Sequence, residues 1–444
     1  MRSKGLLESM VLFFSILVHP MWVLAEIPLE KISVLANIES KISDETLVRY
    51  RETILPFIEE FGHRRGFEGR PNQDCLTLLN ASPGEFPAGY KKATEEACRV
   101  VVGYIKIYDP SKPSNNAAVV APGLGEAYVK YQEVGYFLAQ EGYNPVYIID
   151  HRGQGSSTRL SPLYAGRPRG ESPIHVDRFE NYILDFAKMI NIVNMGMDPP
   201  EKIFLLSNST GGSIITGYLT RPDLRAKNIA AYGNVSPFFV PGARSNIEKF
   251  AMYSARKIGG TDAQFWLANK VLSRDCNLNN QDVYPMPCLF EYDGGTPRHY
   301  SFDTAENSNY LRLTTSPEQY NLNKWLVAQN DGTEVGDKTR GWVLRAMDYL
   351  ADLNHSYTEY NTPTYYFVGT DDVVVSPVAT KMYYDHLLDV IDQKSVVSEA
   401  GNRLTPADFQ FETIPGAAHE ILNESDEIRL YAFKKIMEFF EQYK

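Results

Sequence analysis

The sequence predicts an α/β fold in which helices cover both faces of a mostly parallel sheet. From about residue 98 to residue 237, short apolar segments alternate with amphipathic helical segments. Two of these segments, 117–121 and 144–150, are largely apolar, which is typical of parallel strands buried on both faces. The alternation indicates βαβ units, and 444 residues suffice for one large domain of this type with insertions.

The same pattern divides the chain into segments. We expect an export signal at 1–25, an N-terminal region of helix and loops at 26–97, and an α/β core formed by 98–237 and 361–444. Residues 238–360 interrupt the alternation with helical patches, loops and many aromatic residues. A segment longer than one crossover requires is expected to form a cap inserted over the functional face of the sheet.

The individual elements are expected from hydrophobic periodicity and from turn and capping residues. Residues 66–90 are rich in turn formers, Ser425 is positioned to cap the last helix, and Tyr431 is expected on the same side of that helix as Ile436. The predicted helices are 45–61, a segment through 131–138, 177–194, the segment after 209, 377–389 and 425–443, and the predicted strands are 99–108, 117–121, 144–150, 202–208, 228–235, 363–369 and 409–414.

The first 25 residues have the character of a secretory signal. Arg2 and Lys4 precede a broken apolar run over residues 10–24, and Val23-Leu24-Ala25 fits a cleavage site. The run is too short and too interrupted for a membrane span of about 20 residues. We therefore expect a secreted or periplasmic protein, and peripheral contact with a membrane is compatible with this. The alternative is that the segment is not cleaved and anchors the protein in a membrane.

Charge and cysteine content exclude several classes of function. The net charge is −11 without any Lys/Arg run, which argues against a nucleic-acid partner. Export permits disulfides, and neighbour pairing of Cys75 with Cys98 and of Cys276 with Cys288 is favoured over four free thiols. No C-x-x-C or H-E-x-x-H pattern occurs, so we predict no metal and no cofactor.

A serine at a strand-to-helix corner is the main candidate for chemistry. Ser207-Asn208-Ser209-Thr210-Gly211 follows a short apolar strand and precedes an apolar helix. Such a corner presents Ser209 as a nucleophile elbow, G-x-S-x-G, with Ser207 in place of the first glycine. A purely structural turn is the alternative reading of these residues taken alone.

A serine nucleophile needs a base within reach and an acid that orients the base. His419 lies in a small-residue loop after the last predicted strand, whereas the other histidines lack this context. The acid is Asp371 or Asp372, in the loop after the preceding strand, and the G-x-x-D spacing favours Asp372. The order serine, acid, histidine along the chain is that of an α/β-hydrolase.

The oxyanion formed by attack on a carbonyl needs preorganised N–H donors. We expect one from Thr210, directly after the nucleophile, and one from Leu124, between Gly123 and Gly125 in the loop after an early strand. An ordinary glycine turn is the alternative for the second loop. A phosphate-binding loop is excluded because neither G-x-x-x-x-G-K-[ST] nor G-x-G-x-x-G is present.

With these residues assembled, the chain resembles the α/β-hydrolase superfamily, and within it the lysophospholipase and monoacylglycerol lipase branch, which also holds serine aminopeptidase-like members. Five motifs carry the resemblance in order: Pro122–Glu126, Asp150–Ser157, Ser207–Gly212, Gly369–Asp372 and Gly416–Glu424. The resemblance implies an α/β-hydrolase fold with an inserted cap and a catalytic triad.

The resemblance extends to a helix of the bacterial lysophospholipases, H-V-x-x-F-x-x-Y-x-x-D, which corresponds to His175–Asp185. Three positions depart from the family pattern. Pro122 replaces a histidine that would brace the oxyanion loop, Ser207 replaces a glycine, and Asn208 replaces a histidine before the nucleophile. None of these changes removes a reacting group.

The resemblance implies an exported serine hydrolase that acts on a small lipid or ester, with a single-acyl lipid as the expected substrate. Three alternatives stay open. An aminopeptidase or amidase would place an acidic cap residue, Glu291 or Asp293, near a free amine. A general carboxylesterase would prefer short esters, and an exported binding protein would retain the site without catalysis. The sequence leaves the oligomeric state open.

Overall fold

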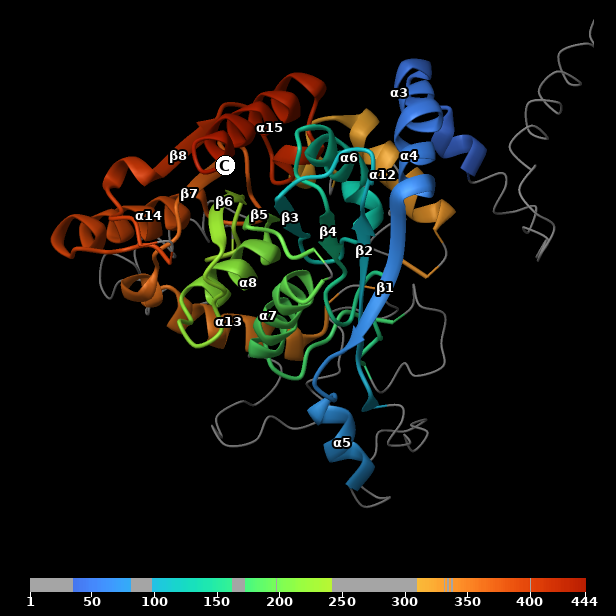
Figure 1. The fold of residues 1–444 in the computed structure, drawn as a ribbon. Helices are drawn as coiled ribbons and strands as arrows, with labels where there is room; N and C mark the ends of the chain where they lie inside the picture. The colour runs from blue at the N-terminus through green and yellow to red at the C-terminus, as the bar shows by residue number, and fades with distance from the viewer. Residues whose placement is uncertain are drawn as a thin grey trace, which may run out of the picture.

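An eight-stranded sheet forms the centre of the computed structural model (Figure 1). The structure describes residues 35–80, 98–161, 172–196, 198–241, 310–330, 332–333, 335–336, 338–399 and 401–444. The sheet order is β1-β2-β4-β3-β5-β6-β7-β8. The strands are β1 (Gly62–Glu68), β2 (Val101–Ile107), β3 (Asn116–Ala121), β4 (Val146–Ile149), β5 (Lys202–Asn208), β6 (Ile229–Val235), β7 (Thr364–Gly369) and β8 (Phe409–Ile414).

The sheet is parallel from β4 through β3 and β5 to β8, and antiparallel where β1 and β2 join it. The predicted α/β fold class with a mostly parallel sheet is therefore confirmed. Ala121 of β3 is opposite Ser207 of β5, and Gly369 of β7 is opposite Ile414 of β8. This register brings the loops that follow these strands to the same edge of the sheet.

Two hydrophobic cores lie on opposite faces of the sheet because side chains alternate along a strand. Val119 and Leu205 contribute to one core, whereas Val120 and Leu206 contribute to the other. In Figure 1 α6 and α15 lie above the sheet and α7, α8 and α13 lie below it. The covering helices are α6 (Gln132–Gln140), α7 (Glu180–Asn194), α8 (Thr210–Leu219), α12 (Pro317–Gln329), α13 (Arg340–Leu353), α14 (Pro377–Gln393) and α15 (Asp426–Glu441).

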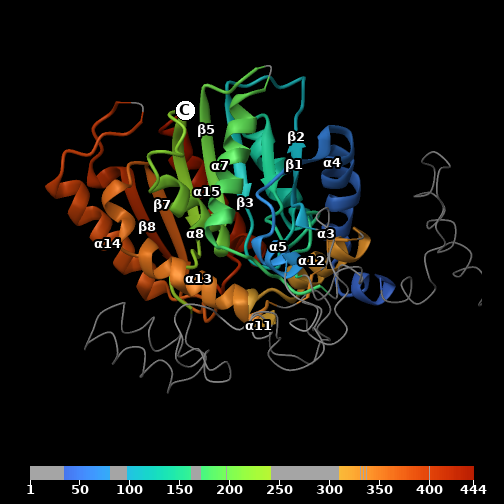
Figure 2. The same ribbon diagram turned by 90° about the horizontal axis from the view of Figure 1, so that it is seen from below.

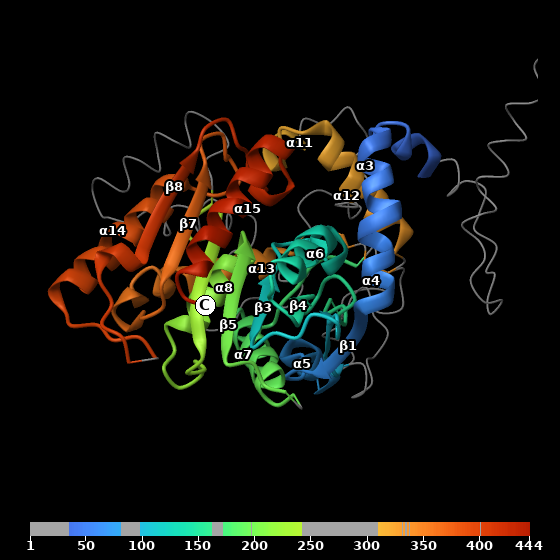
Figure 3. The same cartoon turned by 45° about the horizontal axis from the view of Figure 1, so that its top comes forward.

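The helix expected at 45–61 is present as α3 (Asp44–Arg49), a π-helical turn (Tyr50–Ile54) and α4 (Leu55–Phe61). Figure 3 shows this stretch beside α6 and α12. At its start, the Ser43 hydroxyl donates a hydrogen bond of 2.5 Å to Glu318 of α12. The N-terminal helix thus joins the core to a helix of the expected cap segment.

The described part of the turn-rich region, residues 66–80, contains regular structure that was not predicted. Residues 62–68 form edge strand β1, and residues 73–80 form α5 (Gln73–Asn80). Within β1 only Phe67 is buried. An edge strand with a single buried side chain lacks the alternation of apolar and polar residues by which a strand is recognised in a sequence.

The cysteine prediction is confirmed where the structure describes it, because a disulfide joins Cys75 to Cys98. Cys276 and Cys288 lie outside the described residues, as does the export signal at 1–25.

The last helix, α15, differs from its prediction in two details. Ser425 occupies the N-cap position, but its side chain makes no capping hydrogen bond. Tyr431 is 43% exposed, and its hydroxyl donates a hydrogen bond to Glu412 instead of packing with Ile436. The neighbouring elements therefore decide which side chains of α15 are buried. Tyr431 lies at the edge of the buried face, with its ring partly covered and its hydroxyl at the surface.

The described part of the expected cap consists of α11 (Tyr310–Leu313), α12 and α13, which gather along one edge of the molecule in Figure 2. Residues 242–309 lie outside the described residues, so the boundaries of the cap and of the other segments remain predictions. None of the described helices has the length and apolar character that crossing a membrane requires.

Candidate active site

Ser209 lies at the corner between β5 and α8 with φ 54° and ψ −119°. A non-glycine residue with this conformation is held there by its surroundings. The Ser209 N–H donates to Val235 O at 3.0 Å, and the Ser209 carbonyl accepts from Gly212 N and Phe238 N at 2.8 and 3.0 Å. These bonds fix a sharp turn at the end of the strand, as the elbow pattern predicted.

Close packing around the corner explains which residues it tolerates. A Cβ at Gly211 would lie 2.1 Å from the carbonyl oxygen of Ala121, so only glycine fits there. The extra hydroxyl of Ser207 has partners, because its Oγ lies 2.5 Å from the Tyr232 hydroxyl and 3.2 Å from Asn234 Oδ1. The departure from glycine at this position is thus accommodated by buried hydrogen bonds.

The structure brings Asp372 and His419 together, with Oδ2 and Nδ1 2.8 Å apart. The other oxygen of Asp372 accepts from the N–H groups of Val374 and Val375 at 2.8 and 3.0 Å. Asp371, the alternative acid, is exposed and points to the loop surface. The carboxylate that contacts the imidazole is therefore held on both of its oxygens.

The carboxylates around His419 favour its protonated form. Burial alone would lower the pKa of His419, but Asp372, Glu420 and Glu126 together raise it above its ordinary value of 6.5. Within the described residues Ser209 Oγ makes no hydrogen bond, so the hydroxyl and the imidazole are not joined directly. Such contacts are often long in the absence of substrate.

The loop after β3 lies against Ser209. A Cβ at Gly123 would be 3.0 Å from the Cβ of Ser209. Among the described residues, no acceptor binds the N–H of Leu124 or the N–H of Thr210. Thr210 begins α8, where the first N–H groups of a helix have no intrahelical acceptor. Both predicted oxyanion donors are thus unoccupied beside the nucleophile candidate.

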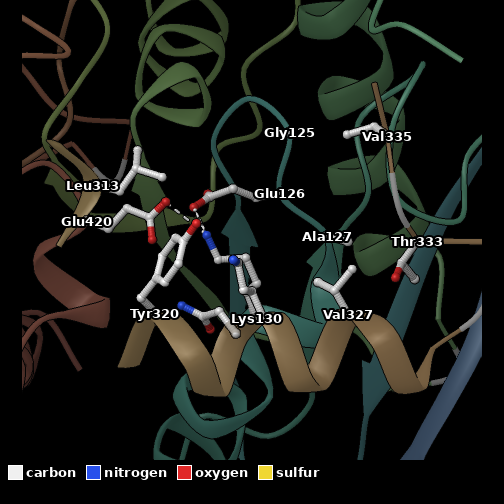
Figure 4. Close-up of a pocket in the computed structure, with 12 residues that line it drawn as sticks. Gly125, Glu126, Ala127, Lys130, Leu313, Tyr320, Val327, Thr333, Val335 and Glu420 are labelled. Atoms are coloured by element: carbon white, nitrogen blue, oxygen red, sulfur yellow. Dashed lines mark hydrogen bonds and ion pairs between the residues drawn. The ribbon is translucent and has the colours of Figure 1, made fainter. Parts of the chain in front are cut away.

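Two buried carboxylates share one lysine next to this loop (Figure 4). Lys130 Nζ lies 2.8 Å from Glu126 and 2.9 Å from Glu420. Burial acts to raise the pKa of Glu126, but Lys130 and other donors lower it to about 2. The pKa of Glu420 is raised, by burial and by the nearby charge of Glu126. Sequence reasoning missed this cluster, since nothing in the pattern marked Lys130.

A cleft opens beside the cluster, between α12 and the loops after β3 and β8 (Figure 4). Its polar lining includes Glu126, Lys130 and Glu420, and its apolar lining includes Leu313 and Val327. A cleft lined by both polar and apolar side chains suits a molecule that combines a polar group with an apolar chain.

Other motif residues brace the site without reaching it. Arg152 is fully buried and holds both carboxylate oxygens of Asp185 in α7, at 2.6 and 2.8 Å. His175 is buried between Asp74 and Thr339, each 2.8 Å from a ring nitrogen. The H-V-x-x-F-x-x-Y-x-x-D pattern therefore supports the packing of α7 in this chain.

The described residues contain no cluster of three or more His, Cys, Asp or Glu side chains suited to a metal ion. Glu291 and Asp293, the amine-binding candidates, lie outside the described residues.

Comparison with known proteins identifies the family. A family profile described as serine aminopeptidase, S33, matches residues 112–426, which is more than half of the chain. The chain belongs to the serine aminopeptidase S33 family. As a member it is a serine hydrolase of the α/β-hydrolase superfamily, so the predicted superfamily and enzyme class are confirmed.

The relatives of this S33 hydrolase include lysophospholipases. It is 28% identical to lysophospholipase L2 of Escherichia coli K12 over 330 residues, which are 74% of this chain and 81% of that protein. It is 30% identical to a probable lysophospholipase L2 of Haemophilus influenzae over 139 residues, 31% of this chain and 40% of that protein. A soluble variant of monoglyceride lipase from Saccharomyces cerevisiae, solved with a substrate analogue, has a TM-score of 0.52 at 14% identity, over 81% of this chain and 96% of that chain. At this identity the likeness shows the fold alone.

Proposed function

We propose that this S33 hydrolase is an exported enzyme that cleaves the carboxylic ester of a single-acyl lipid, either a lysophospholipid or a monoacylglycerol. Ser209 is the nucleophile, His419 is the general base and acid, and Asp372 orients the imidazole. The N–H groups of Leu124 and Thr210 bind the oxyanion. Export is inferred from the N-terminal sequence, and the segment 238–360 is proposed to be the cap.

The reaction proceeds in two steps through an acyl-enzyme. His419 takes the Ser209 proton as the oxygen attacks the ester carbonyl, and the resulting oxyanion accepts hydrogen bonds from the two N–H groups. His419 then protonates the departing alcohol, which leaves the acyl group on Ser209. Water, deprotonated by His419, attacks the acyl-enzyme and releases the fatty acid.

The observation that carries this proposal is the 2.8 Å contact between Asp372 and His419, whose loops follow the adjacent strands β7 and β8. A buried carboxylate on Nδ1 leaves Nε2 as the ring nitrogen available to a hydroxyl. The left-handed conformation of Ser209 at the elbow supports its part as the nucleophile.

The lipid substrate is supported by two independent points. The cleft lined by Glu420, the residue after His419, combines charged residues such as Lys130 with apolar residues such as Leu313 and Val327. The relative from E. coli, similar over three quarters of this chain, is a lysophospholipase. One acyl chain and one polar headgroup match a cleft of this composition, whereas a free amino acid amide would leave the apolar lining uncovered.

Hydrolysis assays with four substrates test the proposal. The purified mature chain is given a lysophospholipid, a monoacylglycerol, a p-nitrophenyl ester of butyrate and an amino-acid arylamide. Ser209→Ala is the inactive variant, and Ser395→Ala, at an exposed serine, is the matched control. We expect fatty acid release from the first or second substrate, abolished in Ser209→Ala and unchanged in Ser395→Ala.

Each other result points to a different assignment. Turnover of the arylamide alone would move the protein to the aminopeptidases, and turnover of butyrate alone would indicate a general carboxylesterase. No turnover together with no labelling of Ser209 by a fluorophosphonate would refute the enzyme and leave a binding protein.

A further inference from the structure

We propose that Gln154 is a positioning residue that orients the oxyanion loop, residues 122–126, toward the substrate carbonyl. The inference rests on the proposed function, because it takes the Leu124 N–H as an oxyanion donor. Gln154 is 1% exposed and belongs to the loop that follows β4. It does not touch the reacting atoms, and it acts on a neighbouring loop through its side-chain amide.

The side chain of Gln154 binds the oxyanion loop at three points. Its Nε2 donates to the carbonyl oxygens of Gly123 and Glu126 at 2.8 and 3.3 Å. Its Oε1 accepts from the N–H of Gly125 at 3.1 Å. These peptide groups lie on both sides of Leu124, so one rigid amide group sets the orientation of the Leu124 peptide.

A second N–H group of the loop, besides that of Gly125, is also occupied. The Gly123 N–H donates to the carboxylate of Glu126 in a short hydrogen bond. Proline at 122 has no N–H. Among the described residues, the Leu124 N–H is therefore the one donor between 122 and 125 that has no acceptor. The hydrogen bonds that hold residues 122–125 thus leave the Leu124 N–H for a substrate oxygen.

Gln154 is itself held in place by neighbouring groups. The backbone of Gln154 donates to His151 O at 3.1 Å and accepts from Ser157 N at 3.0 Å. His151 reaches the same oxyanion loop, with its Nε2 2.9 Å from Pro122 O. The loop after β4 thus supplies side-chain hydrogen bonds to the oxyanion loop. In the family pattern, a histidine at the position of Pro122 would provide such a bond.

Kinetics of Gln154→Met separate positioning from packing. Methionine has nearly the length of glutamine but can form none of the three hydrogen bonds. A misdirected donor costs about 10- to 100-fold in rate. We therefore expect kcat for a p-nitrophenyl ester to fall by about this factor with KM unchanged. The melting temperature should also fall, because three buried polar groups lose their partner.

The decisive readout is inhibition by a trifluoromethyl ketone that carries the same acyl chain, since its adduct with Ser209 has the tetrahedral oxyanion. Its Ki is expected to rise by the factor by which kcat/KM falls. A merely structural role would lower the melting temperature without this match. Gln393→Met, at an exposed position on α14, is the matched control and should change neither constant.

The outcomes distinguish this inference from the proposed function. An active wild type with unchanged kcat and Ki in Gln154→Met would overturn the inference alone. A wild type that neither hydrolyses the ester nor reacts with a fluorophosphonate would overturn both. If Gln154→Met does not fold, Gln154→Glu keeps an acceptor for Gly125 but loses the two donors, and the same match between Ki and kcat/KM is required of it.

Discussion

His151 is a buried imidazole whose protonation should destabilise the fold. It is 2% exposed, its Nε2 donates to Pro122 O, and its ring meets Tyr182 edge to face. Burial lowers the pKa of His151 from 6.5 to about 4, although the Pro122 carbonyl and Glu126 act in the opposite direction. The folded protein therefore holds this imidazole neutral at pH values where the unfolded chain would protonate it.

The magnitude follows from the two pKa values. Between pH 6.5 and about 4 the unfolded chain binds a proton at His151 that the folded chain does not, so the free energy of unfolding falls as the pH falls. One pKa unit corresponds to about 1.4 kcal/mol, so this single group removes about 3 kcal/mol by pH 4. This is a large share of a typical total stability of about 5–15 kcal/mol.

Urea unfolding at pH 7, 6, 5 and 4 measures the effect. In His151→Gln the amide can still donate to Pro122 O but does not titrate. We expect the wild type to lose about 3 kcal/mol more than this variant between pH 7 and pH 4. His63→Gln, at an exposed histidine of β1, is the matched control and should follow the wild type. Parallel stability curves for wild type and His151→Gln would refute the reasoning.

Three further predictions concern the triad, a buried ion pair and the elbow. Asp372→Asn should lower kcat by about 10⁴-fold, and since Asp372 helps to raise the pKa of His419, the acid limb of the pH–rate profile should move to lower pH. Asp185→Asn leaves Arg152 buried without its bidentate partner, which should cost about 3 kcal/mol in urea unfolding. Gly211→Ala would put a Cβ 2.1 Å from a backbone oxygen, and should lower the free energy of unfolding by about 1–3 kcal/mol.

Each of these changes has a matched control in the chain. Asp371→Asn, at the exposed neighbour, should leave kcat and the acid limb unchanged. Asp389→Asn, exposed on α14, should leave the unfolding free energy unchanged. Gly196→Ala places a Cβ 3.5 Å from its nearest neighbour and should be tolerated. An Asp372→Asn enzyme with wild-type kcat would contradict the role assigned to this carboxylate.

Local pattern was sufficient to predict most of the fold. Parallel strands β3 to β7 are almost wholly buried, and each was predicted within a few residues because burial on both faces leaves a continuous hydrophobic signal. Edge strand β1 was missed for the opposite reason, since five of its seven residues are exposed. Ser425 and Tyr431 were also misjudged, because side-chain capping and burial on a helix depend on neighbours distant in sequence.

Motifs predicted those residues of the candidate site that lie in recognisable local turns. The small-residue loops mark Ser209, Asp372 and His419, since strand-to-helix corners and loops at the ends of parallel strands need such residues. The G-x-x-D spacing favoured Asp372 over Asp371, and the contact of Asp372 with His419, 47 residues away in the chain, agrees with that choice.

Two parts of the site depend on tertiary contacts alone. Lys130 between Glu126 and Glu420, and the Gln154 side chain against the oxyanion loop, join segments that local periodicity does not relate. The sequence by itself determined which residues form the strands, the elbow and the loops, because those depend on local backbone preference and hydrophobic pattern. The tertiary structure decided which charged groups pair and which N–H groups remain unoccupied. Buried polar groups need hydrogen-bond partners, and these come from segments that only the fold brings together.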